Sequence, residues 1–308
     1  MDTIPKLIIK GQEIPWPPVT ILIPVYGGGR YLRETMESIW QNCYPNFEVI
    51  FVDDGSRDDS KKICRQFTEK DHRVRFYGFD RNRGMDRVLN FGIKQAHGKY
   101  IARLNQDDLI KPRRLERQVR FLEKHPDHVA VGGQIILFTD KKKVFDRIYF
   151  PLTDQEIRAK WLIFSPFSDP AATYRKQAFL KTRGYSQGFW PVDDVHMWYQ
   201  LGKIGKLANL PQVVTKVRWH GECGSIRFHR LQMQKIWEVH CWAAKNISLP
   251  PFWVWFFWVG QRLAGVFLPA EFNWYVYRQL KKLTISREAI WAQLKARRLA
   301  SVKLPASR

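Results

Sequence analysis

The sequence predicts an α/β fold with a mostly parallel sheet flanked by helices, and three observations support this prediction. Short apolar segments rich in β-branched and aromatic residues alternate with segments of helical periodicity from residue 19 to residue 138. The first of them, VTILIPVY, is apolar along its whole length, as in a strand buried on both faces. Polar or acidic residues follow several of the segments, at the strand ends where parallel sheets bind ligands.

Each element of this alternation has its own signal. Prolines at positions 15, 17 and 18 end a short N-terminal extension before the first strand, and Pro112 opens the last helix of the series. The first helix carries four apolar residues at helical spacing: Leu32, Met36, Ile39 and Trp40. We expect strands at 19–26, 47–54, 73–80, 99–108 and 128–138, and helices at 30–42, 60–70, 85–96 and 112–124.

The alternation ends near residue 153. Beyond it we expect helices at 153–163, 175–182 and 193–206, and a strand at 210–221. After residue 227 the pattern is helical and aromatic, and PPFWVWFFWVGQRLAGVFLP is the most apolar segment of the chain. We therefore expect an N-terminal extension (1–18), an α/β domain (19–230) and a C-terminal helical region (231–308) that is aromatic and basic.

Composition restricts the partners that the chain can bind. The 51 Lys and Arg outnumber the 29 Asp and Glu, for a formal net charge of +22, which indicates an anionic partner. No helix-turn-helix, zinc-ligand or RNP-like pattern is present, so we expect no nucleic acid as partner. The 13 Trp and 20 Phe together with the cations suit an anionic membrane surface. The four cysteines lack a CxxC pair and the N-terminus lacks a signal peptide, which favours a cytoplasmic protein.

Two predicted strand ends carry acidic groups. FVDDGSRDDS places Asp54 where its carboxylate could accept hydrogen bonds from a nucleotide, although an Asp-Gly-Ser turn also serves to cap the next helix. IARLNQDDLI ends in four oxygen-bearing side chains, Asn105 to Asp108. Mg²⁺ and Mn²⁺ are held by one or two carboxylates plus substrate phosphates, so this loop is either a cation site or a hydrated turn before the helix.

The joint pattern identifies a family resemblance. ILIPVYGGGRYLRETMESI, EVIFVDDGSRDDS and RNRGMDRVLNFGIKQAHGKYIARLNQDD, in this order, resemble a family 2 glycosyltransferase with the GT-A (Rossmann-like) fold. GYSQGFWPVDDVHMWYQLGKIGK resembles the acidic motif of that family, and VRWHGECGSIR resembles its His-Gly-Ser loop. The resemblance covers residues 19–228. It implies an inverting enzyme that uses a nucleoside-diphosphate-sugar, most typically a UDP-sugar, and Mn²⁺ or Mg²⁺.

The resemblance also implies roles for individual residues. Asp107 is the expected metal-binding acid of the DXD motif, with His220 as a second ligand, and Asp194 is the expected catalytic base. The expected acceptor side comprises Asp193, Trp190 and Asp169. The expected donor-binding residues are Pro24, Val25, Tyr26 against the base, Asp54, Arg81, Asn82, Gly84, Arg103, Asn105 and Gln106.

The chain departs from the family pattern at two acids. Where the DXD motif usually has its first aspartate, this chain has Asn105, so the loop carries one charge fewer. The acidic motif is usually Glu-Asp, and here it is Asp193-Asp194. The Asn105 substitution is the best support for an alternative function, a non-catalytic module that binds nucleotide-sugars or membranes.

Asp194 falls at the predicted start of a helix. We expect the helix dipole to favour the ionised carboxylate, which suits a base, while an N-cap role is equally compatible with the position. His196, two residues on, fits the core better than the site. For His220, hydrogen bonding within its loop and metal ligation remain alternatives.

The aromatic segment at 252–268 is interrupted by Gln261 and Arg262, so it is short for a membrane span. We expect a helix that lies at the inner face of the cell membrane, with a span or packing on the α/β domain as alternatives. A membrane location predicts a glycan or lipid-linked acceptor, as in bacterial surface polysaccharide or glycolipid synthesis. Direct sugar transfer to polyprenyl phosphate is a further alternative, which would need a site for the acceptor phosphate.

Overall fold

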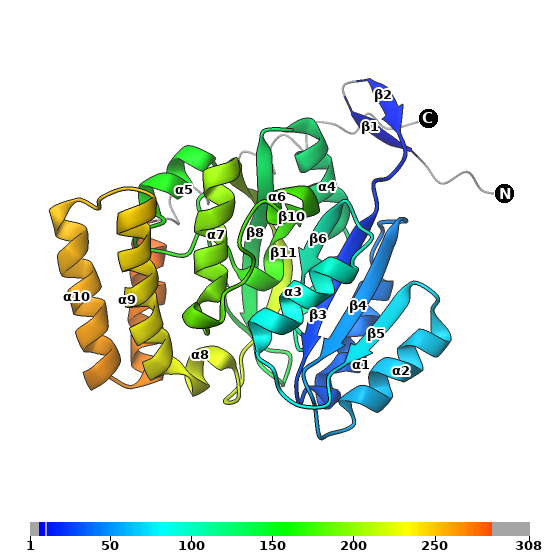
Figure 1. The fold of residues 1–308 in the computed structure, drawn as a ribbon, viewed down its shortest axis with the longest axis horizontal. Coiled ribbons are helices and arrows are strands. Elements are labelled where there is room, and N and C mark those ends of the chain that lie inside the picture. The colour runs from blue at the N-terminus through cyan, green and yellow to red at the C-terminus, as the bar shows by residue number, and fades with distance from the viewer. Residues whose placement is uncertain (1–5, 10, 285–308) are drawn as a thin grey trace.

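A nine-stranded sheet with helices on both faces forms the centre of the protein (Figure 1). The computed structural model describes residues 6–9 and 11–284. Eight strands follow the order β5-β4-β3-β6-β10-β8-β11-β7, and β9 pairs with β8. The predicted α/β fold is therefore confirmed.

One half of the sheet is parallel. β3 (Val19–Val25) pairs with β4 (Phe47–Asp53) and β6 (Tyr100–Arg103), and β4 pairs with β5 (Val74–Gly78), all in parallel register. All seven residues of β3 are buried, as the unbroken apolar run predicts. This register brings the carboxyl ends of β3, β4 and β6 to one edge of the sheet, where the acidic segments follow.

The other half of the sheet is mixed. β10 (Thr173–Arg175) lies antiparallel between β6 and β8 (His128–Phe138), and β11 (Lys206–Arg218) is parallel to β8. β7 (Leu109–Ile110) and β9 (Val144–Ile148) add antiparallel pairs. The sequence analysis missed β7, β9 and β10, because strands this short carry too little alternation to show a period.

Several predicted boundaries move. The predicted strand at 99–108 is wrong beyond Arg103, since the chain leaves the sheet there as a loop. The predicted helix at 175–182 shrinks to α6 (Lys176–Phe179), and that at 153–163 to α5 (Asp154–Lys160). The last strand begins at residue 206 rather than 210 and ends at 218.

The helices divide between the two faces of the sheet. Leu32, Ile63 and Leu115 belong to one buried apolar cluster and represent α1 (Gly29–Trp40), α2 (Ser60–Lys70) and α4 (Arg114–Lys124). Val88 and Trp198 belong to the cluster on the opposite face, with α3 (Met85–Gln95), α5 and α7 (Asp193–Ile204). The short elements are the hairpin β1 (Leu7–Ile9) and β2 (Gln12–Ile14), and the 3-10 turns η1 (Asp169–Ala171) and η2 (Gln187–Phe189).

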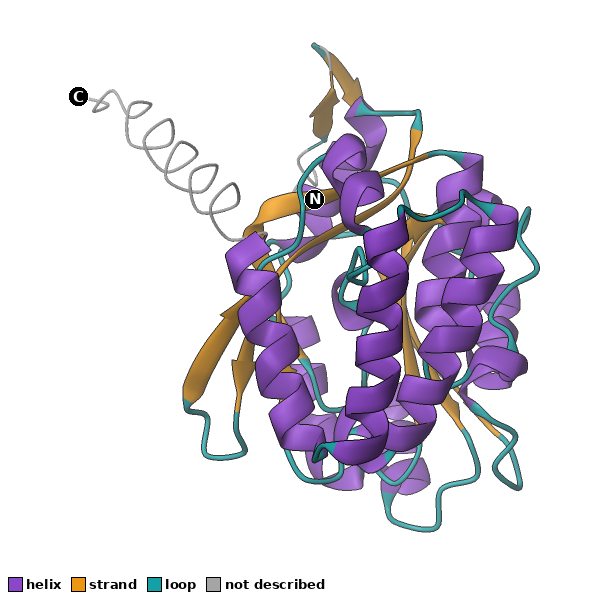
Figure 2. Ribbon diagram, turned by 90° about the vertical axis from the view of Figure 1, so that its left-hand side faces the viewer, coloured by secondary structure: helices purple, strands orange, loops and turns teal. Residues whose placement is uncertain are grey.

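Beyond the short α8 (Gly224–Arg227), three helices stand side by side against the second face: α9 (His229–Asn246), α10 (Phe252–Phe267) and a helix at 270–284 (Figure 2). Val239 of α9 and Trp258 of α10 belong to the same buried cluster as α7. The Trp258 indole donates a hydrogen bond to the Leu162 carbonyl at 2.6 Å. The domain boundary at residue 230 stays a prediction, but α9 and α10 share a core with the preceding elements.

The helix at 270–284 is fixed to β9 by charge. Arg278 and Lys282 both contact the carboxylate of Asp146, at 2.6 and 2.5 Å. No helix in the part of the chain that the structure describes is long and apolar enough to cross a membrane. Of the predicted basic tail, these two residues and Lys281 are described, and the cations from Arg287 to Arg308 lie outside the described residues.

Arg114 joins the two halves of the sheet from the inside. Its side chain is 1% exposed, and burial lowers the pKa of its guanidinium to about 9. It donates to Gln118 and Thr215 and to three backbone carbonyls, those of residues 103, 170 and 172. A single side chain thus satisfies acceptors of α4, β6, η1, β11 and the residue before β10.

We expect Arg114→Met to lower the free energy of unfolding by about 3–5 kcal/mol, because buried carbonyls lose their donors. Urea denaturation measures the change. Arg113→Met is the matched control, since Arg113 is an exposed neighbour whose surface ion pair with Glu116 is worth less than about 1 kcal/mol. Equal effects of the two substitutions would contradict the assigned role.

Candidate functional site

A single cavity of about 1620 Å³ begins at the carboxyl ends of β3, β4 and β6 and extends to the C-terminal helices. Of the predicted site residues, Arg81 alone lies outside it, exposed on a neighbouring surface depression beside Arg87. The others line the cavity: Pro24, Val25, Tyr26, Asp54, Asn82, Gly84, Arg103, Asn105, Gln106, Asp107, Asp169, Trp190, Asp193, Asp194 and His220.

Tyr26 and Gln106 are joined by two hydrogen bonds across the mouth of the cavity. The Tyr26 N–H donates to the Gln106 Oε1 at 2.8 Å, and the Gln106 Nε2 donates to the Tyr26 carbonyl at 3.1 Å. A Cβ at position 28 would come within 2.1 Å of the Gln106 Cδ, so this approach requires Gly28. Gln106 therefore fixes the backbone that presents the half-exposed Tyr26 ring.

Asp54 shapes the opposite wall. Its carboxylate oxygens accept hydrogen bonds from the backbone N–H groups of Arg83 (2.6 Å) and Gly84 (3.0 Å). Burial raises the pKa of Asp54, and these two N–H donors partly oppose that shift. Gly84 has a φ of +99°, which a side chain would strain. Asp54 thus positions the turn at 82–84, and each of its oxygens keeps a lone pair for a ligand.

Asn105 has a structural reason to be an amide. Its Oδ1 accepts from Arg103 Nη2 at 3.1 Å, and its Nδ2 donates to Asp108 Oδ2 at 3.1 Å. Asp108 is buried, and its other oxygen accepts from the Arg218 N–H at 2.8 Å. Burial, and then the charge of Asp107, raises the pKa of Asp108 well above its ordinary value. An aspartate at 105 would face this carboxyl group without a proton to donate, so the departure from the family motif fits its surroundings.

Asp107 and His220 are the candidate metal ligands that face each other. The Asp107 Oδ2 lies 2.9 Å from the His220 Nε2, and the His220 Nδ1 is buried without a partner. Two neighbouring ligands of an octahedral cation, each about 2.1 Å from it, are about 3 Å apart. The pair therefore fits a divalent cation that takes its other ligands from phosphate and water. Asp108 cannot contribute without breaking its bonds to Asn105 and Arg218.

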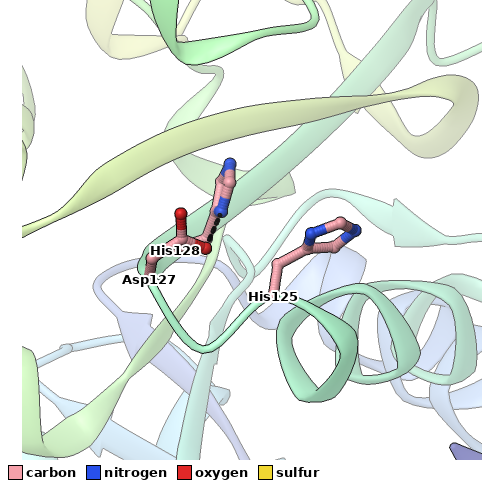
Figure 3. Close-up of side chains that lie close together, drawn as sticks. All are labelled: His125, Asp127 and His128. Atoms are coloured by element: carbon pink, nitrogen blue, oxygen red, sulfur yellow. Dashed lines mark hydrogen bonds and ion pairs between the residues drawn. The ribbon is translucent and has the colours of Figure 1, made fainter. Parts of the chain in front are cut away.

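Within the described residues, one group has at least three converging His, Cys, Asp or Glu side chains: His125, Asp127 and His128 (Figure 3). These residues lie on the turn between α4 and β8, at the amino end of β8 and thus away from the cavity. Asp127 is already bonded to His128 Nδ1 and to Lys206 Nζ, both at 2.9 Å. This group is a surface ion cluster that plays no part in the cavity.

Three carboxyl groups line the same cavity, those of Asp169, Asp193 and Asp194, and the first of them is paired with a buried cation. Arg103 Nη2 donates to Asp169 Oδ2 at 2.6 Å. Burial, and then the charge of Asp169, raises the pKa of Asp193 to about 7. Burial, followed by the charges of Asp169 and Asp193, raises the pKa of Asp194 well above its ordinary value. Asp193 and Asp194 therefore both hold a proton more tightly than an exposed aspartate does, and their titrations are coupled.

The structure corrects one argument about Asp194. The sequence predicts that the helix dipole keeps it ionised, but burial and like charges outweigh the lowering effect of the Val195 N–H and raise its pKa. The N-cap alternative does not hold either, because Val192 occupies that position and no side chain caps the helix. His196 is buried beside Phe189 and Trp242, as predicted for a core residue.

The sequence analysis lists Arg103 as a donor contact, and the geometry favours a different role. The guanidinium is 1% exposed, and both Nη atoms are bonded to protein acceptors. It therefore positions Asn105 and Asp169 from behind the cavity wall. Arg218 was missed altogether: it is buried and donates to the Asp107 carbonyl at 3.0 Å and to Glu34 at 2.5 Å. Its place two residues before His220 was the available signal.

Known proteins share this fold and much of the sequence. The family model described as "Glycosyl transferase family 2" matches residues 20–183. An uncharacterized glycosyltransferase of Rickettsia prowazekii is 39% identical over 224 residues, which are 68% of this chain and 66% of that protein. The putative glycosyltransferase EpsE of Bacillus subtilis is 32% identical over 206 residues, which are 66% of this chain and 73% of that protein.

The chain spans only part of several curated relatives. The match covers 66% of an uncharacterized glycosyltransferase of Haemophilus influenzae, and 35%, 39% and 37% of three longer Rickettsia proteins. Among solved structures, the mannosyltransferase PcManGT of Pyrobaculum calidifontis, in complex with GDP-Man and Mn²⁺, gives a TM-score of 0.60 at 16% identity, over 93% of this chain and 81% of that chain. TarS of S. aureus with UDP-GlcNAc gives 0.55 at 15% identity, over 81% of each. These neighbours support the GT-A fold.

We expect the raised pKa of Asp193 to make folding stability depend on pH. The folded protein holds this proton up to about pH 7, whereas the unfolded chain releases it near pH 3.8, so stability falls as the pH rises between these values. Between pH 4.5 and 7.5, the free energy of unfolding of Asp193→Asn should therefore fall by on the order of 3 kcal/mol less than that of the wild type. Urea denaturation at pH 4.5 and 7.5 measures it.

The control for this experiment is Glu69→Gln, which removes an exposed acid on α2. Its effect on stability should be the same at both pH values. If the free energy of unfolding of Asp193→Asn changed with pH as strongly as that of the wild type, Asp193 would be ionised in the folded protein. The prediction would then be wrong.

Proposed function

Because the chain belongs to glycosyl transferase family 2, we propose that it moves a sugar from a nucleoside-diphosphate-sugar, most typically a UDP-sugar, to an acceptor hydroxyl with inversion. One observation supports this most strongly. The Tyr26–Gln106 mouth, the Asp107–His220 pair and the acid group around Asp194 share a single cavity. A donor that enters at the strand ends can therefore meet an acceptor activated from the other side.

The donor-binding wall consists of backbone as much as of side chains. Tyr26 offers an aromatic face to a nucleotide base, and the turn at 82–84, held by Asp54, lies opposite. Asp107 and His220 would hold Mn²⁺ or Mg²⁺. Such a cation stabilises the charge on the departing diphosphate.

Asp194 is the proposed base. Burial raises its pKa well above the ordinary value of an aspartate, which suits a group that must take the proton of a hydroxyl. In the reaction, the acceptor oxygen bonds to the anomeric carbon, its proton passes to Asp194, and the bond from that carbon to the diphosphate oxygen breaks. The diphosphate leaves with the bonding electron pair. Arg103 pairs with the neighbouring Asp169, while Asp193 and Asp194 have no such ion pair among the described residues.

The outer face of α10 supports a location at a membrane surface. Its large exposed residues are apolar: Phe252, Trp253, Trp255, Phe256, Val259, Leu263, Val266 and Phe267. The partly exposed Arg262 is the charged residue within this helix. Lys245 is exposed close by in the chain, and the whole protein carries +22. An apolar helix face flanked by cations is stabilised in the headgroup region of an anionic bilayer. The acceptor would then be a glycan or lipid-linked glycan of a surface polysaccharide pathway.

Asp194→Asn should reduce sugar transfer or donor hydrolysis with UDP-sugars and Mn²⁺ by about 10²–10⁴-fold, because the base is lost. Thermal stabilisation by the donor should persist. In the wild type, the rate should fall as the pH drops through the raised pKa of Asp194, since only the carboxylate accepts a proton. Asp127→Asn, a surface acid away from the cavity, is the control.

Asp107→Asn should act differently. It should raise the Mn²⁺ concentration needed for half-maximal rate and weaken the thermal stabilisation by donor plus metal. No stabilisation of the wild type by UDP-, GDP- or dTDP-sugars, with or without metal, would favour the non-catalytic module instead.

Membrane association has its own test. We expect the double substitution Phe256→Ser and Leu263→Ser to weaken binding to phosphatidylglycerol vesicles at least about tenfold. The two apolar side chains would contribute about 3 kcal/mol or more when the bilayer buries them. Vesicle sedimentation measures this. Leu180→Ser, an equally exposed leucine next to α6, should have no effect. Unchanged binding of the double variant would leave α10 without a membrane role.

A further inference from the structure

The cavity continues past the acid group into an inner chamber between the sheet and the helix at 270–284. We use this name for the part lined by Phe150, Phe164, Trp274, Tyr277 and Lys281. The Trp274 ring lies 5.1 Å from Trp219, the residue before His220. The Tyr277 ring lies 5.5 Å from both Trp274 and Phe164. The chamber therefore begins beside the proposed metal ligands and has aromatic walls.

Tyr277 ties the chamber to the reaction centre. Tyr277 and Asp194 line the same cavity, and burial, followed by the charge of Asp194, raises the pKa of the Tyr277 phenol. An acceptor whose hydroxyl is next to Asp194 has the chamber directly behind it.

Lys281 brings an unpaired amine into this chamber. Burial lowers its pKa well below the usual value, and an anion beside it would favour the protonated form again. Its side chain is 3% exposed, and its Nζ lies 3.6 Å from the centre of the Phe150 ring and 5.7 Å from that of Tyr277. Within the described part of the chain, no carboxylate pairs with it and no hydrogen bond is formed by its ammonium group. A buried amine without an anion is costly, and a ring face compensates only in part.

The neighbours of Lys281 show that an anion was within reach of the helix. Arg278 and Lys282, on the same helix, both bond to Asp146 of β9. Lys281 is directed to the inside, away from that carboxylate. The helix thus uses two cations for attachment to the sheet and leaves the third in the cavity.

Other polar groups in the same cavity also lack partners. Gln232 Oε1 on α9 and Gln261 Oε1 on α10 are buried without a hydrogen bond, and both residues line the cavity. Buried polar atoms of this kind bind water or the polar groups of a ligand. The aromatic walls, the free amide oxygens and the cation together match a ligand that is apolar or sugar-like and carries a negative charge.

We propose that the inner chamber binds an anionic group of the acceptor, a phosphate or a carboxylate, through Lys281. The proposal rests on the proposed function for the identity of its ligand as the acceptor. Two sources have this chemistry: the phosphate of a lipid-linked acceptor and the acid group of a charged glycan. The ion pair with Lys281 sets the acceptor so that its hydroxyl meets Asp194, and an acceptor without the charge loses this anchor.

The test is a binding titration followed by tryptophan fluorescence, which needs no donor, metal or turnover. The lipid arm uses decyl phosphate against decyl glucoside, both below their critical micelle concentrations. The glycan arm uses methyl glucuronide against methyl glucoside. We expect the wild type to bind one anionic probe at least about tenfold more tightly than its neutral counterpart, and the arm that does so identifies the source.

Lys281→Met keeps the length and packing of the side chain and removes the charge, and it should abolish this preference. The control, Lys282→Met, removes a cation that is paired with Asp146 and should retain it. We also expect Lys281→Met to melt at the same temperature as the wild type or higher, because a buried amine without a partner is lost. A clearly lower melting temperature with an unchanged preference would make Lys281 structural and overturn the proposal.

Equal binding of charged and neutral probes by the wild type, or no binding of either anionic probe, would also overturn it. Loss of donor hydrolysis in the wild type itself would instead count against the proposed function, so the two failures are distinguishable.

Discussion

The buried guanidinium of Arg103 is the interaction on which the rest of the site depends. It reaches the Leu22 and Leu104 carbonyls, the Asn105 side chain and the Asp169 carboxylate, and so joins β3, the end of β6, the acidic loop and η1. A charge this deep requires an anion, which Asp169 supplies. Burial, and then the charge of Asp169, raises the pKa of both Asp193 and Asp194, and the proposed base acquires the proton affinity that its chemistry requires.

The cost of burying unpaired charge also explains the altered acidic loop. An aspartate at position 105 would have added a third carboxylate beside Asp107 and Asp108, in a place where burial already raises the pKa of Asp108. The amide bonds to Arg103 on one side and to Asp108 on the other. Asp107 is thereby left as the acid that turns toward His220. In the loop that lacks one acid, the amide at position 105 therefore has a hydrogen-bond partner for both its oxygen and its nitrogen.

The C-terminal helices extend the site rather than merely follow it. Asp146 attaches the helix at 270–284 to β9, and this attachment sets Trp274 against Trp219 and Tyr277 in the wall of the cavity that Asp194 also lines. α10 buries Val254 and Trp258 and turns an apolar face outward. One helical layer thus has a side toward the proposed acceptor and a side toward the proposed membrane.

The sequence by itself determined the α/β alternation, the strand ends and the acids that follow them, because local periodicity and turn residues encode these features. It also placed Asp54 and Asp107 at one edge of the sheet, since the ends of parallel strands meet there, and the family resemblance added Asp194. Only the tertiary structure decided the shift in the pKa of Asp194, the bridging role of Asn105 and the unpaired state of Lys281. Those properties arise from desolvation and from the way the folded chain closes around each group. The pairing of Arg103 with Asp169, 66 residues further along the chain, is one such contact that no local pattern records.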